Sequence, residues 1–369
     1  MLLLVVLILL VLVLVEISSR KTSCTAPDAV TRETIFVVLP LYRPTDALGT
    51  LKSIFENADA PQSIRVGILE HNHSKRPTAA DLYYAAQQKN QAPPFAHRVK
   101  YKRTDSAYYG AAVAREWILD NFYGGERYLL FVTQRTLLLP HWDRTLLTSL
   151  QAAHAMGGHV VSQFPCLAAA TGSLPSTFPV MHAFSDRNTP MFKGRLIIGE
   201  YRQPLASAMA SWRCLFGSAS VLRQGFCSAG LPFLPNAEAD LLLSYELWAQ
   251  GYLAFIPSES AAVTAAAASA HHSWLDTQLA PVVQFTDSAI RALLAGKKPA
   301  ASTYSEKLAS RQVRHKVSDF LHWLRIKPSK RYVAGQTVLG LLPDHTEEEI
   351  IRKYGSLQRF QEVKERFTF

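Results

Sequence analysis

The chain has 369 residues, of which 48% are apolar and 18% are charged, and its 39 Lys and Arg outnumber its 29 Asp and Glu, giving a formal charge of +10. This length and apolar content suffice to bury one large core or two smaller ones, which excludes a disordered chain, a collagen-like repeat and a small disulfide scaffold. The four cysteines include no Cys-x-x-Cys pair, and this excludes a zinc finger and a thioredoxin-type redox centre.

An unbroken apolar run over residues 1–15 opens the chain. As a helix it would extend about 25 Å, slightly less than the ~30 Å hydrocarbon core of a bilayer. It predicts a signal anchor or a signal peptide over residues 1–17, and the absence of a strong small-x-small cleavage site favours the anchor. Arg20 and Lys21 follow the run while no basic residue precedes it, so the positive-inside rule does not itself support a lumenal C-terminal part. In either form the segment directs the chain into the secretory pathway.

A polar linker over residues 18–33 separates this segment from an alternation of strand-like and helix-like segments. Short apolar runs rich in β-branched residues predict strands over 35–41, 64–69, 127–132, 159–164 and 252–256, with a strand or buried segment over 216–222. Apolar residues at helical spacing predict helices over 48–55, 111–121, 143–155 and 241–250. Continuously apolar strands that alternate with helices indicate an α/β fold with a mostly parallel sheet.

Two long segments lack a clear period. Residues 165–213 contain five prolines spread among Gly, Ser and Thr. We expect them to form irregular loops that bind an acceptor, because long unstructured segments inside compact domains usually serve function. The alanine-rich run over 261–270 has low complexity and is expected to be a loop or a weak helix.

Ligands of open α/β sheets bind beyond the carboxyl ends of the strands. The candidate site residues are therefore those that directly follow each predicted strand. They are Tyr42 and Arg43, the segment from Glu70 to His73, the segment from Thr133 to Arg135, and the segment from Gln163 to Cys166. The sequence has no Gly-x-Ser-x-Gly elbow, no phosphate-binding P-loop and no Gly-x-Gly-x-x-Gly turn, which argues against α/β-hydrolases, P-loop enzymes and dinucleotide dehydrogenases.

A collinear set of short strings connects the chain to a known family. The strings run from Ile35 to Arg43, from Phe55 to Ala58, from Gly125 to Leu129, from Pro140 to Asp143, from Val161 to Pro165 and from Leu247 to Tyr252. In this order they resemble the protist UDP-GlcNAc:polypeptide α-N-acetylglucosaminyltransferases, which attach GlcNAc to hydroxyproline or threonine on proteins, and the resemblance covers residues 33–355. It implies a GT-A-like fold of nucleotide-diphospho-sugar transferases, UDP-GlcNAc as donor substrate, and a protein or glycoprotein acceptor. It also implies a single-pass membrane protein of the Golgi or ER with a lumenal catalytic domain.

The resemblance implies donor-binding roles for two residues after the first predicted strand and for one arginine in the helix predicted over 111–121. Tyr42 would stack on the uracil ring, and Arg43 and Arg115 would contact the diphosphate or the uridine. Glu70 follows a predicted strand and would line the same donor pocket.

The departures from the family fall where its metal binds. The family has an Asp-Ser-His metal triplet at the position of Thr133, Gln134 and Arg135, and a further metal-site His near His271 and His272. The change removes both metal ligands of the triplet, which puts bound Mn²⁺ or Mg²⁺ in question. Gln134 and Arg135 remain candidate donor-binding residues. Because arginine can bind diphosphate oxygens through two hydrogen bonds, a metal-independent transferase in which Arg135 replaces the cation is one interpretation. A catalytically inactive homologue that binds a glycan, a glycoprotein or an active transferase is the other.

Two carboxylates stand where the resemblance places the acceptor. Glu238 and Asp240 occupy the position of the family's Gly-Gly-Glu-Glu segment. Either carboxylate could orient or deprotonate an acceptor hydroxyl as a catalytic residue. They could instead cap and charge the start of the helix predicted over 241–250.

The positive charge is concentrated near the C-terminus. Between Arg291 and Arg331, eleven Lys and Arg stand against Glu306 and Asp319, so the rest of the chain is almost neutral. This stretch predicts a surface for an anionic partner or a solvated helix face, and no zinc, RRM-like or helix-turn-helix signature points to nucleic acid. The sequence thus divides into an anchor over 1–17, a stem over 18–33, a glycosyltransferase-like domain over 34–290 and a basic helical extension over 291–369 that completes the domain.

Overall fold

The computed structural model describes most of the chain between residues 34 and 264 and two short strands beyond it. The described residues are 34–42, 47–71, 77–88, 95–104, 111–165, 177–184, 190–196, 203–207, 209–224, 236–264, 326–327 and 332–333. The chain divides into two compact units, residues 1–33 and residues 34–369, and the fold below belongs to the second. The predicted anchor and stem, and most of the basic extension, lie outside the described residues.

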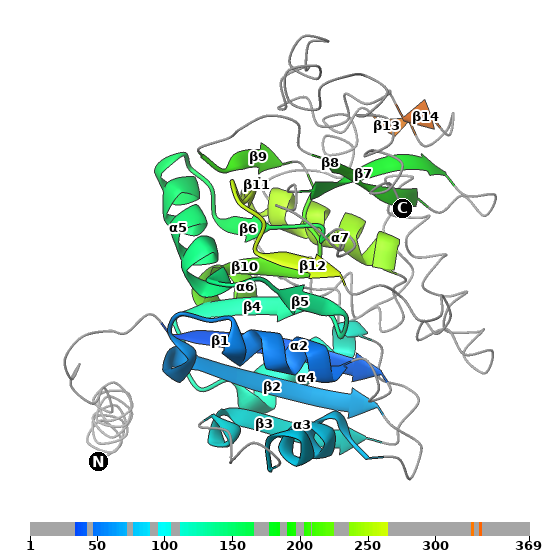
Figure 1. Cartoon of the computed structure of the whole chain (residues 1–369). Helices are drawn as coiled ribbons and strands as arrows, with labels where there is room; N and C mark the ends of the chain where they lie inside the picture. Colours follow the sequence, from blue (N-terminus) through cyan, green and yellow to red (C-terminus); the bar gives the residue numbers. More distant parts are fainter. Residues whose placement is uncertain are drawn as a thin grey trace, which may run out of the picture. The chain divides into compact units, whose positions relative to one another are not determined.

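An eight-stranded sheet forms the centre of the fold, in the order β3-β2-β1-β4-β10-β6-β11-β9 (Figure 1). The strands are β1 (Ile35–Tyr42), β2 (Ile64–His71), β3 (Val99–Thr104), β4 (Tyr128–Val132), β6 (Val160–Ser162), β9 (Leu205–Ser207), β10 (Cys214–Ser218) and β11 (Ala254–Ile256). Strands β9 and β10 run antiparallel to their neighbours, and the other six are parallel to one another. The mostly parallel sheet that the sequence predicts is confirmed.

Strand β1 is paired on both edges and covered on both faces. Its first residue, Ile35, stands opposite Ile64 of β2 and Tyr128 of β4. Every residue from 35 to 41 is buried. A parallel strand in such a position needs a continuous apolar run rather than an alternating one, and this is the pattern that its sequence has.

Helices cover both faces of the sheet (Figure 1). On one face lie α2 (Ala47–Glu56), α3 (Ala79–Gln88) and α5 (Trp142–Ala155), and on the other lie α4 (Ala111–Phe122), α6 (Ala219–Gln224) and α7 (Asn236–Ala249). Alternate residues of β1 enter the two layers, because successive side chains of a strand point to opposite faces. Val37 and Leu39 pack with the first set of helices, and Phe36 and Val38 pack with the second.

Three smaller sheets and two short 3-10 helices complete the description. Strand β5 (Thr136–Leu138) pairs with β12 (Ala262–Thr264), β7 (Thr177–Phe184) with β8 (Pro190–Leu196), and β13 (Ile326–Lys327) with β14 (Tyr332–Val333), all antiparallel. The 3-10 helices are η2 (Pro61–Ser63) and η3 (Ala96–Arg98). These pieces surround the central sheet without extending it.

Most elements of the central sheet lie where the sequence predicts them, within a few residues at each end. Two expectations are wrong in the described residues. The start of the alanine-rich run, expected to be a loop or a weak helix, forms β12, because Ala262 to Thr264 pair with β5. The segment 165–213, expected to be irregular, contains β7, β8 and β9. The strand or buried segment expected over 216–222 is confirmed in part, since its first three residues lie in β10 and the rest in α6. Helix α3 and the edge strand β3 had no sequence prediction.

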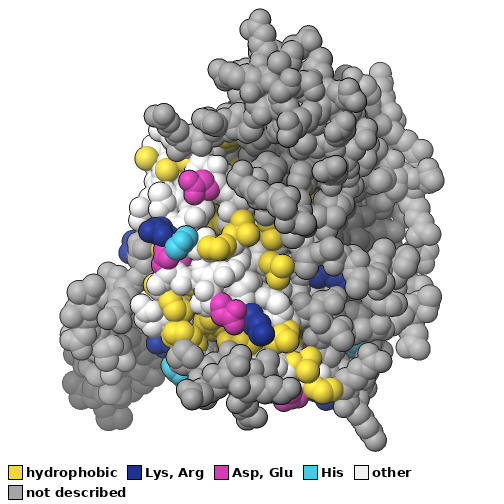
Figure 2. All heavy atoms as spheres, in the orientation of Figure 1, with side chains coloured by type: hydrophobic (Ala, Val, Ile, Leu, Met, Phe, Trp, Pro, Cys, Tyr) yellow, Lys and Arg dark blue, Asp and Glu magenta, His cyan; other side chains and the backbone are white. Residues whose placement is uncertain are grey.

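The predicted membrane and charge features fall mainly outside the described part. Within the described ranges, no helix is both long and apolar enough to cross a bilayer. The apolar run of residues 1–17 is not among those ranges, and of the basic stretch over 291–331 only β13 is. On the face shown in Figure 2, the described acidic and basic side chains lie beside one another instead of forming a field of one sign. The anionic-partner surface therefore stays a prediction.

Candidate active site

The carboxyl ends of the parallel strands meet at one edge of the sheet. Strands β1, β2, β4 and β6 end there at Tyr42, His71, Val132 and Ser162. Strand β10 lies between β4 and β6 in the opposite direction, and its first residue, Cys214, is paired with Val132. The loop before β10 therefore meets the turns after β4 and β6 at this edge.

The turn after β4 is fixed by hydrogen bonds from two sides. The Oγ1 hydroxyl of Thr136 donates to the carbonyl oxygen of Arg213 at 2.9 Å. The Oγ1 hydroxyl of Thr50 in α2 donates to the carbonyl oxygen of Gln134 at 2.7 Å. Gln134 and Arg135, the predicted donor-side residues of this turn, are both half-buried. Their backbone is thus held in place at the carboxyl edge.

Asp240 of α7 is buried, with 3% exposure, and bonds to the loop before β10. Its Oδ1 accepts a hydrogen bond from the backbone N–H of Trp212 at 2.8 Å, and its Oδ2 accepts one from the hydroxyl of Ser211 at 3.0 Å. Burial raises the pKa of Asp240 to about 6, although nearby guanidinium groups and these hydrogen bonds lower it. The carboxylate therefore ties the start of α7 to the loop and is largely charged at neutral pH.

Two guanidinium groups interact electrostatically with Asp240. The Cζ atom of Arg115, a 6% exposed residue of α4, lies 4.2 Å from the centre of the Trp212 ring. The Cζ atom of Arg213 lies 4.2 Å from the centre of the Phe164 ring. Burial lowers the pKa of Arg115 to about 10 and also lowers that of Arg213, while the Asp240 carboxylate raises both. Both groups stay protonated at neutral pH, so the three side chains carry two positive charges and one negative charge.

Gln163, directly after β6, stabilises the fold at this edge. It is fully buried, and its Oε1 accepts hydrogen bonds from the N–H groups of Ala261 at 2.9 Å and Ala262 at 3.2 Å. Its Nε2 donates to the carbonyl oxygen of Ala262 at 2.9 Å. These bonds hold the start of the alanine-rich run, and with it β12, against the end of β6.

The structure brings some of the predicted site residues together. Arg115 and Asp240 lie in one electrostatic cluster, and Gln134 and Arg135 lie on the turn beside it. Glu70 is buried at the end of β2, where its Oε2 accepts a hydrogen bond at 2.8 Å from the backbone N–H that begins α3. Glu70 therefore holds the first turn of α3.

Other predicted residues are described only in part or not at all. Arg43, His271 and His272 lie outside the described residues. Tyr42 is the last residue of β1 and Glu238 lies in the first turn of α7, but the side chains of both are outside the description. Their predicted roles stay predictions.

The structure adds Arg213 and Trp212 to the candidate site. The sequence placed Arg213 at the end of a supposed acceptor loop and assigned no role to Trp212. The sequence pattern that could have indicated these two residues is the polar and aromatic string from Ser211 to Arg213, directly before an apolar strand. That string reaches the carboxyl edge only because β10 is antiparallel, and strand direction cannot be read from the apolar run itself.

The side chains described at this edge do not fit a divalent cation. Mn²⁺ and Mg²⁺ prefer carboxylate, carbonyl and water oxygens. The turn after β4 presents Thr133, Gln134 and Arg135 and has no carboxylate, and Asp240 already bonds to the loop and faces two guanidinium groups. Within the described ranges, no group of three or more His, Cys, Asp or Glu is placed to hold a metal.

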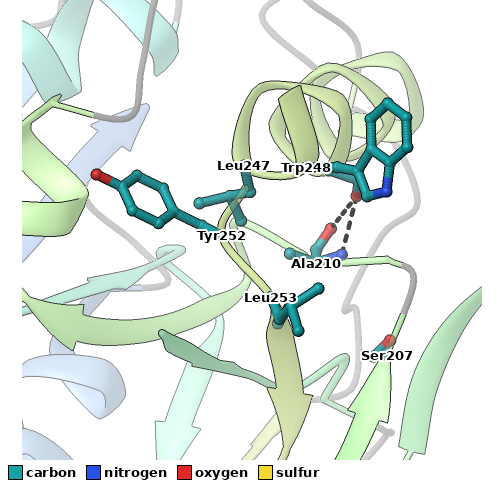
Figure 3. A pocket seen from close by; sticks show the side chains of 8 residues that line it. Ser207, Ala210, Leu247, Trp248, Tyr252 and Leu253 are labelled. Carbon is teal, nitrogen blue, oxygen red and sulfur yellow. Dashed lines mark hydrogen bonds between the residues drawn. The ribbon is translucent and has the colours of Figure 1, made fainter. Parts of the chain in front are cut away.

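A small pocket lies away from this edge, between α7 and the segment that leads into β11 (Figure 3). The residues that line it are Ser207, Ala210, Ser244, Leu247, Trp248, Tyr252, Leu253 and Ala254. The hydroxyl of Ser244 accepts a hydrogen bond from the N–H of Ala210 at 2.9 Å. The space open to the centre of a water molecule is about 10 Å³, which is room for roughly one water. The pocket is too small for a sugar nucleotide.

The chain was compared with solved structures, and two of the matches are as follows. A crystal structure of GalNAc-T7 with UDP, GalNAc and Mn²⁺ matches with a TM-score of 0.53 at 12% identity, over 78% of this chain and 56% of that one. A crystal structure of residues 1–349 of TarS from S. aureus matches with a TM-score of 0.44 at 13% identity, over 90% of this chain and 81% of that one. This chain therefore spans little more than half the length of the GalNAc-T7 chain. The mostly parallel sheet with its polar carboxyl edge places the protein in the class of GT-A-like glycosyltransferase folds.

The family follows from the sequence match. The family model described as glycosyltransferase (GlcNAc) matches residues 34–109 and 98–320, which together make up most of the chain. The chain belongs to this family and is a protein of the glycosyltransferase class. A comparison with curated proteins gives no match. The matched range contains every strand of the central sheet and the whole candidate site.

Proposed function

We propose that this protein transfers GlcNAc from UDP-GlcNAc to a hydroxyl group of Ser, Thr or hydroxyproline on a protein of the secretory pathway, without a divalent cation. The family description, which names GlcNAc, supports the sugar. The resemblance of residues 33–355 to the protist enzymes supports the acceptor. The observation that carries the proposal is the carboxyl edge itself, where guanidinium groups occupy the surroundings of the turn after β4 and that turn has no carboxylate.

The transfer requires positive charge at the leaving group. The bond between the anomeric carbon and the phosphate oxygen breaks, the acceptor oxygen bonds to the same carbon, and the acceptor proton passes to a base while UDP leaves. Negative charge develops on the departing diphosphate, and preorganised cations stabilise it. Arg135, on the rigid turn after β4, can supply a planar fork of donors for phosphate oxygens.

The acceptor side of the proposal rests on the start of α7. Asp240 is buried and bonds through both oxygens to the loop before β10, so we assign it a positioning role. Glu238, in the first turn of the same helix, is then the carboxylate left to accept the proton of the acceptor hydroxyl. Tyr42, the last residue of β1, and Arg43, the next residue in the sequence, remain the proposed contacts to the uridine.

The proposed location is the Golgi or ER membrane, with the apolar run of residues 1–17 as a single anchor and the catalytic domain in the lumen. The apolar run and the resemblance support this location, whereas Arg20 and Lys21 after the run do not favour this orientation. Protease protection of the full-length protein in sealed microsomes tests it. Protection of the region after residue 34 is expected, and complete digestion without detergent would contradict the lumenal orientation.

Donor binding and turnover test the activity. The full-length chain, purified in detergent, is titrated calorimetrically with UDP-GlcNAc and with UDP, each in EDTA and in Mn²⁺. Transfer is measured as UDP release with peptides that contain Ser, Thr or hydroxyproline. Binding and UDP release that persist in EDTA are the expected result. Binding that requires Mn²⁺ would contradict the metal-free mechanism.

A non-catalytic relative is the second candidate, because the same missing carboxylates that suggest metal independence would also follow from a loss of activity. Such a protein would keep the fold to bind a glycan, a glycoprotein or an active transferase. Absence of both UDP binding and UDP release, in EDTA and in Mn²⁺, would favour it over the transferase.

A further inference from the structure

The cluster formed by Arg115, Arg213 and Asp240 at the carboxyl edge carries a net positive charge. Each guanidinium group interacts electrostatically with the carboxylate of Asp240. One carboxylate offsets one of the two positive charges. Arg115 is buried and Arg213 is half-buried. Removing a cation from water without a full counter-charge is unfavourable, so this excess of positive charge among the described side chains favours an anion at the site.

The guanidinium groups are held in place by aromatic rings. Arg115 lies over the Trp212 ring and Arg213 over the Phe164 ring, both at 4.2 Å from Cζ to the ring centre. Such stacking engages the face of the guanidinium plane and leaves the N–H groups at its rim available as donors. The Nε atom of Arg115 is buried and has no hydrogen-bond partner among the residues that the structure describes. This unmet donor is a second sign that a ligand belongs here.

The backbone of Arg213 is also held in place, by hydrogen bonds at its carbonyl oxygen and at its N–H group. Its carbonyl oxygen accepts a hydrogen bond from Thr136, and its N–H donates to the hydroxyl of Ser211 at 3.2 Å. Ser211 in turn is bonded to Asp240. A substitution of Asp240 is therefore expected to displace Arg213 through the loop, and this effect needs no direct contact between Asp240 and a ligand.

We propose that Arg115 and Arg213 form the site that binds the diphosphate of the nucleotide-sugar donor in place of a metal ion, and that Asp240 positions them. The naming of the donor rests on the function proposed above. A diphosphate diester carries two negative charges, which the positive charge left after pairing with Asp240 attracts, and its oxygens accept the parallel N–H donors of an arginine fork. Arg135 lies on the turn that is hydrogen-bonded to Arg213 through Thr136, so a third arginine is close to this site in the chain.

Arg213→Gln is the variant that tests the site, and Arg127→Gln is its matched control. Arg127 also lies over an aromatic ring, with its Cζ 5.2 Å from the centre of the Tyr128 ring. It precedes β4 and so lies at the opposite edge of the sheet. Loss of a stacked arginine is common to both variants, but only Arg213→Gln removes a charge from the carboxyl edge.

The measurement is calorimetric titration of the full-length chain in EDTA with two probes, sodium pyrophosphate and UDP-GlcNAc. We expect Arg213→Gln to weaken the binding of both probes by about tenfold or more, as for loss of a charged hydrogen bond. Arg127→Gln should stay within about twofold of the unchanged chain. Arg213→Lys, which keeps the charge but not the fork, should fall between them. Melting temperatures of all variants show whether each one folds.

The outcomes separate this inference from the proposed function. Metal-free binding of UDP-GlcNAc that is equal in Arg213→Gln and Arg127→Gln would overturn the guanidinium site and leave the transferase proposal standing. If UDP-GlcNAc does not bind at all, the transferase proposal fails, and binding of pyrophosphate that depends on Arg213 would still support the anion site. If Arg213→Gln does not fold, the test falls to Arg213→Lys. Pyrophosphate and UDP-GlcNAc binding by Arg213→Lys that equals that of the original chain would overturn the role of the guanidinium group of Arg213.

Discussion

The carboxylate of Asp240 accepts a hydrogen bond from the backbone N–H of Trp212 at 2.8 Å, which joins α7 to the loop that precedes β10. The same loop carries Arg213, and the Trp212 ring lies under the guanidinium group of Arg115. One buried carboxylate is thus bonded to the loop that contacts Arg115 and carries Arg213.

Substitutions of Asp240 separate its charge from its hydrogen bonds. In Asp240→Asn, the side-chain oxygen can still accept from Trp212 N–H and the amide can donate to Ser211, so the loop stays in place while the negative charge is lost. We expect the affinity for UDP-GlcNAc in EDTA to rise several-fold, because the opposing charge near two guanidinium groups is removed. Calorimetry measures the change. A large loss of affinity in a folded Asp240→Asn would contradict the role of Asp240 as a counter-charge.

Asp240→Ala removes both hydrogen bonds and is the paired variant. Two buried donors, the Trp212 N–H and the Ser211 hydroxyl, would lose their acceptor, at a cost of about 1–3 kcal/mol each. We expect a lower free energy of unfolding in urea than for Asp240→Asn, and weaker donor binding. Equal stability of the two variants would show that the loop does not depend on this carboxylate.

Donor binding should depend on pH through Asp240. Burial raises the pKa of Asp240 to about 6, so its carboxyl group gains a proton as the pH falls through this value, and the cluster with Arg115 and Arg213 then becomes more positive. A diphosphate diester keeps its charge over this range, so the affinity for UDP-GlcNAc should rise about three- to tenfold between pH 7.5 and pH 5.

Asp240→Asn is the control for this pH effect, because its side chain does not titrate. Its affinity for UDP-GlcNAc should be nearly constant between pH 5 and pH 7.5. Affinity of the unchanged chain that falls as the pH is lowered, or a pH dependence that persists in Asp240→Asn, would assign the titration to another group.

Thr136 should position Arg213 through a single hydrogen bond. Thr136→Val keeps the shape of the side chain but cannot donate to the carbonyl oxygen of Arg213, which Thr136 reaches at 2.9 Å, and it also loses the hydrogen bond between the Thr136 and Thr133 hydroxyls at 2.9 Å. We expect a loss of about 1–3 kcal/mol in the free energy of unfolding and weaker pyrophosphate binding. Thr136→Ser retains the hydroxyl and should restore the binding. If valine and serine bind pyrophosphate equally well, this hydrogen bond does not position Arg213.

Gly67 should be required for the packing of α4 on the sheet. A Cβ atom at Gly67 would lie 2.6 Å from side-chain atoms of both Ile118 and Phe36. Gly67→Ala should therefore lower the free energy of unfolding by about 1–3 kcal/mol, as for an overpacked core. Gly49→Ala in α2, where the nearest atom is Leu137 Cδ2 at 3.3 Å, is the control. A smaller loss or a gain is expected there, because alanine favours the helix; equal losses would contradict the prediction.

Local sequence patterns predicted the framework of this protein. The apolar run of β1 and the helical spacing of α2, α5 and α7 are properties of neighbouring residues, and burial follows from them directly. Two site residues that the sequence selected, Arg115 and Asp240, do meet in one cluster. The family match over residues 34–320 agrees with the glycosyltransferase class that the collinear strings indicated.

Tertiary pairing decided the rest. The alanine-rich run has no period of its own, and three of its residues become a strand because β5 and the amide of Gln163 bond to them. Arg213 reaches the carboxyl edge because β10 enters the sheet antiparallel, between β4 and β6. Strand direction and long-range hydrogen bonds depend on residues tens of positions apart. The sequence by itself therefore determined most elements of the central sheet and the class of the fold, while only the folded sheet determined the remaining strands and which cations stand together at its edge.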